Sequence, residues 1–164
     1  MSGLIRKIEI KDLNGFHSAL SSVAKEGAFL LTVEPPLIER MENFVKDNIK
    51  NNNAQYVCEV NGLIIGWAYI IPYPRQTMGH VGSLGMGVIK PYRGKGYGKK
   101  LLKYVIDHAW SQGLKRLELE VFSDNKIAIN LYKKMGYEVE GIKKYARFYN
   151  GIYQDIVVMA QYRT

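Results

Sequence analysis

Three glycines alternate with two cations and a tyrosine at the start of RGKGYGKK, residues 93–100. The segment follows the apolar run VIKPY and precedes LLKYVI, which has helical spacing. At the first turn of a helix, several backbone N–H groups lack an intrahelical partner, and the helix dipole adds partial positive charge. Glycines let a phosphate approach these groups closely, and Lys95, Lys99 and Lys100 add full charges. This chemistry predicts a site for a pyrophosphate.

Two common nucleotide-binding loops are excluded by spacing. A P-loop requires G-x-x-x-x-G-K-[ST], but here Gly98-Lys99 is followed by Lys100. A dinucleotide fingerprint requires G-x-G-x-x-G, whereas these glycines are evenly spaced at every second residue. A glycine-rich turn with exposed lysines remains the structural alternative.

The strand before the loop, SLGMGVI, supports the functional interpretation. Leu84, Met86 and Val88 share one face, and Gly85 and Gly87 lie between them. Glycine inside a strand often marks a bulge or a close backbone approach. A strand that is splayed there leaves N–H and C=O groups free, and an extended ligand that carries amides could pair with them.

These residues resemble the GNAT superfamily of N-acetyltransferases. The family signature, [Q/R]-x-x-G-x-[G/A] after a bulged strand, is matched by residues 93–98. A second family motif, an asparagine before a short helix with a tyrosine and then a glycine-aromatic pair, is matched by SDNKIAINLYKKMGYEVEG, residues 123–141. The resemblance extends from about residue 55 to the end of the chain.

The resemblance implies acetyl-CoA as the cofactor and assigns parts of it to particular residues. Asn125 is expected to contact the cofactor, and Tyr132 is expected to face its sulfur and to protonate the leaving thiolate. The backbone of Met86, Gly87 and Val88 is expected to pair with the pantetheine arm. The pyrophosphate is expected on the loop formed by Arg93, Gly94, Lys95, Gly96, Tyr97, Gly98 and Lys99.

The chemistry of Tyr132 is reasonable, because a phenol with a pKa of about 10 is protonated at neutral pH and a thiol ionises near 8.5. Glu120 lies twelve residues before Tyr132, as the base glutamate does in related N-terminal alanine acetyltransferases. We therefore expect Glu120 to be the base and Glu118 to be the second candidate, with two solvated carboxylates as the structural alternative. Many relatives carry another glutamate where this chain has Ser83.

Hydrophobic periodicity predicts the elements that position these residues. Apolar residues predict a helix over 97–112, which Gly113 ends. This helix links a strand ending near 90 to one starting near 115, so the two strands should be nearly parallel. The remaining helices are predicted at 13–25, 35–50 and 125–135, with Asp12 as the cap of the first, and the remaining strands at 5–10, 55–60, 63–73, 137–149 and 153–162. We predict one mixed α/β domain over 1–164, with about seven strands, a splayed pair and four flanking helices.

Composition limits the function classes. The chain has 164 residues, a formal charge of +8 and no apolar run of the roughly 18–20 residues that span a bilayer. Cys58 is the single cysteine and the three histidines are scattered, so neither an internal disulfide nor a metal site is expected. The cations are spread rather than aligned on one helix, which argues against nucleic-acid binding. We expect a cytoplasmic protein with no membrane partner, and a homodimer stays open.

The expected activity is direct transfer of an acetyl group to the primary amine of a small molecule, with a free amino acid favoured. The alternatives are a protein N-terminal or lysine acetyltransferase, and a non-catalytic acyl-CoA-binding module; a nucleic-acid-binding protein would leave both motifs unexplained. The candidate walls of the acceptor site are Phe29, Glu34, Tyr73, Tyr145 and Tyr149, although Glu34 could equally cap the helix led by prolines.

Overall fold

The computed structural model of the chain describes residues 2–164. Its helices and strands follow the predicted order. They are β1 (Leu4–Lys7), α1 (Leu13–Lys25), α2 (Ile38–Lys50), β2 (Ala54–Val60), β3 (Leu63–Pro72), β4 (Val81–Val88), α3 (Tyr97–Ser111), β5 (Arg116–Phe122), α4 (Lys126–Lys134), β6 (Glu138–Tyr149) and β7 (Ile152–Tyr162). Within this range no helix is long and apolar enough to cross a membrane.

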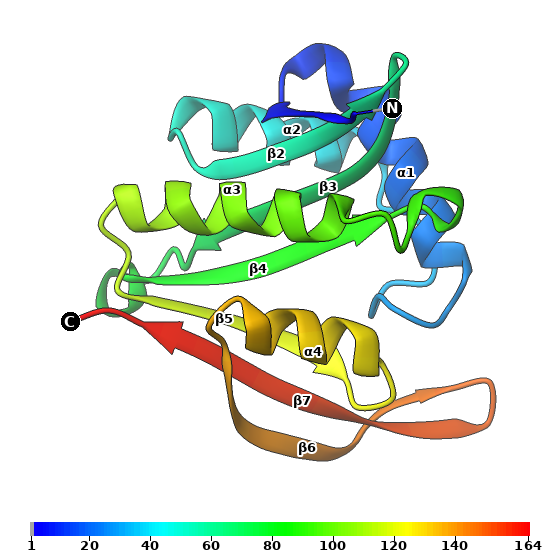
Figure 1. Cartoon of the computed structure of the whole chain (residues 1–164), viewed down its shortest axis with the longest axis vertical. Coiled ribbons are helices and arrows are strands. Elements are labelled where there is room, and N and C mark those ends of the chain that lie inside the picture. The colour runs from blue at the N-terminus through cyan, green and yellow to red at the C-terminus, as the bar shows by residue number, and fades with distance from the viewer. Residues whose placement is uncertain (1) are drawn as a thin grey trace.

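The seven strands form one mixed sheet in the order β1-β2-β3-β4-β5-β7-β6. Neighbouring strands are antiparallel except for β4 and β5, which α3 connects by a crossover. The predicted parallel pair is therefore confirmed. Figure 1 shows that these two strands begin side by side and then separate along their length.

The helices cover both faces of the sheet (Figure 1). The face that carries α3 and α4 holds the larger apolar cluster, which includes Leu101 and Val105 of α3 and Leu117 and Leu119 of β5. The opposite face holds a second cluster, in which α1 and α2 pack on β2 and β3 around Trp67. Burial of each large apolar side chain contributes about 1.5–3 kcal/mol, so these two layers stabilise the sheet from both faces.

The two hairpins form at the predicted turns. Asn61 and Gly62 connect β2 to β3, and Asn150 and Gly151 connect β6 to β7. All four residues have φ between +50° and +79°, as a two-residue turn between twisted strands requires. The helix over 97–112 and the short helix after Asn125 also end where glycine predicted, before Gly113 and Gly136.

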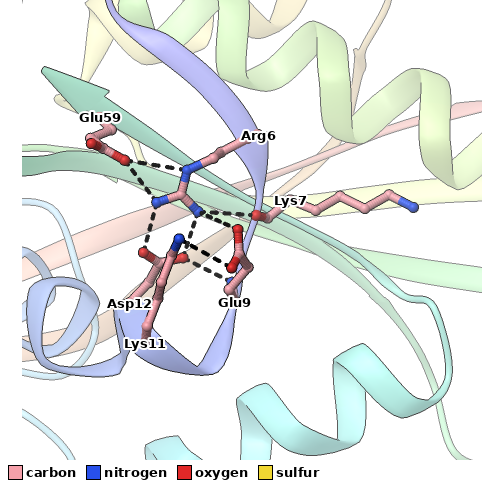
Figure 2. A network of polar contacts seen from close by, with 6 residues as sticks. All are labelled: Arg6, Lys7, Glu9, Lys11, Asp12 and Glu59. Carbon is pink, nitrogen blue, oxygen red and sulfur yellow. Dashed lines mark hydrogen bonds and ion pairs between the residues drawn. The ribbon is translucent and has the colours of Figure 1, made fainter. Parts of the chain in front are cut away.

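A polar network ties β1 to the start of α1 (Figure 2). Arg6 donates hydrogen bonds to both carboxylate oxygens of Asp12, at 2.7 and 2.8 Å, and to Glu59 of β2 at 2.7 Å. Asp12 also accepts from the backbone N–H of Glu9 at 2.8 Å. The helix does begin at Leu13, but the prediction that Asp12 caps it is wrong: its side chain makes no cap hydrogen bond, because Arg6 and Glu9 engage it.

Candidate active site

The sheet opens between β4 and β5, and a cavity of about 490 Å³ lies at this opening. The two strands are paired only from Val81 to Ser83 on β4, where Ser83 lies opposite Glu118. Beyond this point each strand keeps its other neighbour, β3 or β7, but the two no longer pair with each other. The splayed pair expected from the sequence is therefore confirmed, and its point of divergence is Ser83–Glu118.

The backbone of β4 has free groups on the side of the opening. In an antiparallel pair, residues alternate between those that bond to the partner strand and those that point away. Because the N–H of Ile89 bonds to the carbonyl of Ile65 on β3, this alternation directs the N–H and C=O of Leu84, Met86 and Val88 towards β5, and of these the Val88 carbonyl accepts from Arg93. Gly87 belongs to the set that faces β3.

The structural reason for the glycines of β4 could not be seen in the sequence. The register of β4 with β3 is continuous, so the expected bulge is absent from this ladder. A Cβ on Gly85 would lie 2.3 Å from the ring of Tyr69, and a Cβ on Gly87 would lie 2.4 Å from the ring of Trp67. The two glycines make room for aromatic rings of β3 that cross over them.

The glycine loop leads into the first turn of α3, as predicted. Gly94 and Gly96 have φ of +73° and +85°, and a Cβ on either would meet no atom of the described residues within 4 Å. The first helical bond runs from the N–H of Lys100 to the carbonyl of Gly96, so the N–H groups of Gly98 and Lys99 have no intrahelical partner. The loop therefore presents backbone donors to an open space, and Lys95 and Lys99 are exposed beside it.

Two side chains of the loop are used differently from the prediction. The ring of Tyr97 is buried in the core, beside that of Tyr92. The guanidinium of Arg93 donates to the carbonyl of Val88 at 2.7 Å, to both oxygens of Glu26 at 2.9 and 2.5 Å, and lies 4.6 Å from the centre of the Phe29 ring. The hydrogen bond from Arg93 lowers the pKa of Glu26, although burial opposes it. Arg93 thus holds the loop against the segment that follows α1.

Residues around α4 form the other wall of the opening. Asn125 caps this helix, since its side-chain oxygen accepts from the N–H of Ala128 at 3.2 Å, and both Asn125 and Tyr132 line the cavity. The Tyr132 hydroxyl makes no hydrogen bond within residues 2–164, and its ring lies 6.0 Å from that of Tyr137. Burial raises the pKa of Tyr132 to about 12.

Both candidate bases, Glu118 and Glu120, line the cavity from β5, but they differ in setting. The side chain of Glu118 is 23% exposed, and it accepts hydrogen bonds from Tyr73 at 2.6 Å and from Arg116 Nε at 2.9 Å. The side chain of Glu120 is 40% exposed and forms an ion pair with Lys143. Glu118 therefore lies deeper and at the point of divergence.

Tyr73 was expected only as a wall, and its contact with Glu118 is the feature of the site that the sequence did not indicate. The two residues are 45 positions apart, so no local pattern signals the pair. The hydrogen bond to Glu118, together with burial, raises the pKa of Tyr73. Tyr73 consequently remains a donor that fixes one oxygen of Glu118.

The segment between α1 and α2 closes one side of the cavity through Phe29, Leu30 and Leu31. Besides the contact of Arg93 with Glu26, it is held by Arg147 of β6, which donates to the carbonyl of Gly27 at 2.9 Å.

The other expected walls lie elsewhere. Tyr145 packs on Tyr153 at a separate hollow, and Tyr149 packs against Gly27. Glu34 is exposed, and α2 has no side-chain cap, so the suggested capping role of Glu34 is wrong. Among the described residues, no group of three His, Cys, Asp or Glu side chains could hold a metal ion.

Comparisons with known proteins agree with this geometry. Residues 23–137 match the family model described as "Acetyltransferase (GNAT) family". The L-amino acid N-acetyltransferase AaaT of Escherichia coli (strain K12) is 34% identical over 109 residues, which cover 65% of this chain and 67% of that protein.

Solved structures match nearly the whole chain. A GNAT-family acetyltransferase from Streptococcus pneumoniae superposes with a TM-score of 0.92 at 30% identity, covering 99% of this chain and 100% of that one. The Salmonella typhimurium protein yncA, whose structure includes its cofactor acetyl-CoA, superposes with a TM-score of 0.92 at 19% identity, covering 99% and 94% of the two chains. At that identity the second match shows the fold alone.

Proposed function

Because the chain belongs to the GNAT family of acetyltransferases, we propose that it transfers the acetyl group of acetyl-CoA directly to the primary amine of a small molecule. One observation carries the proposal: a single cavity at the opening of the sheet is lined both by Tyr132 from α4 and by Glu118 from β5. Side chains on β5 alternate between the two faces of the sheet, and Glu118 points away from the face that carries α4. The cavity therefore joins an acid on one face of the sheet to a carboxylate on the other.

The residues present fit acetyl-CoA. Free N–H and C=O groups of Met86 and the free N–H of Val88 suit the amides of a pantetheine arm, while Arg93 occupies the carbonyl of Val88. The open backbone donors after Gly96 suit a pyrophosphate, and Lys95 and Lys99 supply charge. When bound, acetyl-CoA supplies a thioester carbonyl that an amine can attack.

Tyr132 is the proposed acid. Its hydroxyl is protonated throughout the neutral range, because burial raises its pKa to about 12. Since this hydroxyl has no other partner among the described residues, it can hydrogen-bond to sulfur as negative charge builds there. A donor that acts mainly in the transition state lowers the barrier.

Glu118 is the proposed base, in preference to Glu120. An acceptor ammonium must lose its proton before the nitrogen can attack, and a positioned carboxylate can take it up. Glu118 lies opposite Ser83, so it supplies a carboxylate from the neighbouring strand near the position where many relatives carry their own. Tyr73 and Arg116 hold the side chain in place. Glu120 is more exposed, at 40% against 23% for Glu118, and it lies two residues beyond the point of divergence.

Within small-molecule amines, a free amino acid is the acceptor that the name of the 34%-identical relative supports. It is therefore the first class to assay, and it is compared below with amines that lack the carboxylate, which the charges of the cavity favour.

The proposal is tested by two measurements on the purified chain. At a hundredfold excess over its dissociation constant, acetyl-CoA should increase the free energy of unfolding by about 2.7 kcal/mol. The melting temperature should rise as a consequence. Release of free thiol should then depend on an added primary amine, assayed with amino acids, alkyl and aryl amines, polyamines and a peptide with a free N-terminus.

The outcomes separate the alternatives. Absence of stabilisation by any acyl-CoA would contradict the assignment of the glycine loop. Stabilisation without thiol release for every amine would support a binding module, and release only with the peptide would support a protein acetyltransferase.

A further inference from the structure

The acceptor side of the cavity has an unusual charge pattern. Glu118, Glu120 and Phe122 project from the same face of β5, next to Ile156 and Val158 of β7. Among the described residues, the two glutamates are the charged side chains that line the cavity, and no lysine, arginine or histidine lines it. A ligand in this part of the site meets carboxylates at the point of divergence and apolar side chains beyond them.

Three cations near the cavity are already committed to other groups. Arg116 pairs with Glu140 through its two terminal nitrogens and with Glu118 through Nε. Lys143 pairs with Glu120. Arg93 pairs with Glu26 in addition to its contact with the Phe29 ring.

We infer, on the premise of the proposed function, that the acceptor is a primary amine with an apolar body and no carboxylate on the carbon that bears the nitrogen. A free α-amino acid would bring its carboxylate close to Glu118, where like charges repel and where no cation lines the cavity within residues 2–164. An arylalkylamine or alkylamine places only its ammonium there.

The remaining walls suit such an apolar body. Phe122, Ile156 and Val158 form a floor on the same side of β5 and β7, and Phe29, Leu30 and Leu31 lie in the segment between α1 and α2. The side chains of Phe29 and Leu31 are 41% and 63% exposed without a ligand. Covering them would contribute to binding about in proportion to the apolar area removed from water.

Arg147 is a further cation whose ability to bind the carboxylate of an acceptor must be considered. It is 8% exposed, and within the described part of the chain it contacts no carboxylate and one of its terminal nitrogens is buried without a partner. However, it does not line the cavity, because its guanidinium lies between the rings of Phe122 and Tyr149, each 4.7 Å away, and donates to Gly27 and Gln154. Its contacts assign it to holding the segment after α1.

The test compares acceptors that differ at one group. Thiol release from acetyl-CoA is measured with 2-phenylethylamine, L-phenylalanine and L-phenylalanine amide, and each kcat/KM is corrected for the fraction of free amine. We expect 2-phenylethylamine to exceed L-phenylalanine by at least about tenfold, which corresponds to about 1.4 kcal/mol. The amide, which keeps the size of the amino acid without its charge, should recover most of the difference.

A variant with one carboxylate fewer tests whether charge repulsion causes the preference for the amine. Glu120→Gln removes one carboxylate and releases Lys143, so the preference for the amine over the amino acid should shrink several-fold. Glu138→Gln, which removes an exposed carboxylate of β6 outside the cavity, is the matched control and should leave the ratio unchanged.

The results that overturn the inference are equally specific. A higher kcat/KM for L-phenylalanine than for the amine and the amide would overturn it while leaving the proposed function intact, and so would a clear preference for spermidine. A ratio that Glu120→Gln leaves unchanged would remove the charge argument. Absence of thiol release with every acceptor would refute the proposed function and this inference together.

Discussion

At Tyr132, one atom, the hydroxyl oxygen, is expected to have a large effect on the rate of acetyl transfer. Replacement by phenylalanine removes the hydroxyl and keeps the ring, so we expect kcat to fall about 10²-fold while the affinity for acetyl-CoA changes less than about twofold. Tyr137→Phe is the matched control, because its ring packs beside that of Tyr132 and it does not line the cavity. Steady-state kinetics with a thermal-shift titration check both; unchanged turnover in Tyr132→Phe would remove this residue as the acid.

Glu118 makes a prediction with a pH signature. We expect Glu118→Gln to lower kcat/KM about 10²-fold at neutral pH, where the acceptor is an ammonium that needs a base. The defect should shrink as the pH approaches the pKa of the amine, because free amine then no longer requires deprotonation. Glu120→Gln should lose less activity over the same range. A larger loss in Glu120→Gln, or a pH-independent defect in Glu118→Gln, would return the role to Glu120 or to positioning alone.

The motif predicts the position of Arg93 in the loop, but not the partner of its side chain. The sequence motif indicates correctly where the loop lies, but it does not indicate that the guanidinium would be directed to Glu26, 67 positions earlier in the chain. Position along a motif is a local property, whereas the partner of a long side chain depends on which element the fold brings next to it.

At the scale of elements, β4 is the strand on which the site depends. Its alternation of apolar residues and glycines predicted a strand with free backbone groups, and that prediction is supported by the divergence after Ser83. The physical reason for the glycines lies in β3, where the rings of Tyr69 and Trp67 occupy the space of a side chain. A cross-strand contact of this kind becomes visible only when the register of two strands is known.

The network at the start of α1 predicts a loss of stability on substitution. Asp12 is 6% exposed, and Asp12→Ala would leave Arg6 with Glu59 and a longer contact to the Glu9 carboxylate at 3.6 Å, and would leave the N–H of Glu9 without its acceptor. We expect a loss of about 2–3 kcal/mol in the free energy of unfolding, less than for a fully buried pair because Arg6 is partly exposed. Urea denaturation measures it.

Lys11→Ala is the control in the same network (Figure 2), because among residues 2–164 the Lys11 ammonium pairs only with Glu9, at 3.2 Å, and its side chain is 68% exposed. It should cost less than about 0.5 kcal/mol. Equal losses in the two variants would mean that Asp12 acts through surface charge rather than through its buried hydrogen bonds.

For the molecule as a whole, net charge and local charge point in different directions. The formal charge of +8 is spread over the chain, and the glycine loop is basic, whereas the acceptor side of the cavity is lined by two carboxylates. The net charge therefore agrees with the proposed binding of an anion at the glycine loop, and it says little about the second substrate. Only the arrangement of the strands separates these two regions.

The stability of the whole molecule should depend on pH through His108. This residue joins α3 to β2 and the turn before it, since its ring nitrogens contact the Tyr56 hydroxyl at 3.1 Å and the carbonyl of Asn52 at 2.9 Å. Burial lowers the pKa of His108, and Lys7 adds to the effect. The unfolded chain then binds the proton at a higher pH than the folded chain does, so stability decreases as the pH falls below about 6.5.

His108→Gln removes this titration, so its melting temperature should fall less between pH 7 and about pH 5. Glu26 and Asp12, whose pKa values are lowered, contribute losses only at more acidic pH, through their own titration. Differential scanning calorimetry over this range separates the pH range in which His108 titrates from the more acidic range in which the two carboxylates titrate. Parallel curves for the parent and the variant would show that His108 does not control the acid response.

The sequence by itself determined the order of helices and strands, both hairpin turns, the parallel crossover through α3, the glycine loop and the place of Tyr132 in the second motif. These features depend on local spacing, because periodicity, turn residues and motif positions are properties of short segments. Tertiary structure alone decided that Tyr73 and Arg116 hold Glu118, that Arg93 pairs with Glu26, and that no cation lines the cavity within residues 2–164. Such contacts join residues far apart in the chain, and their geometry exists only after the sheet has brought its strands together.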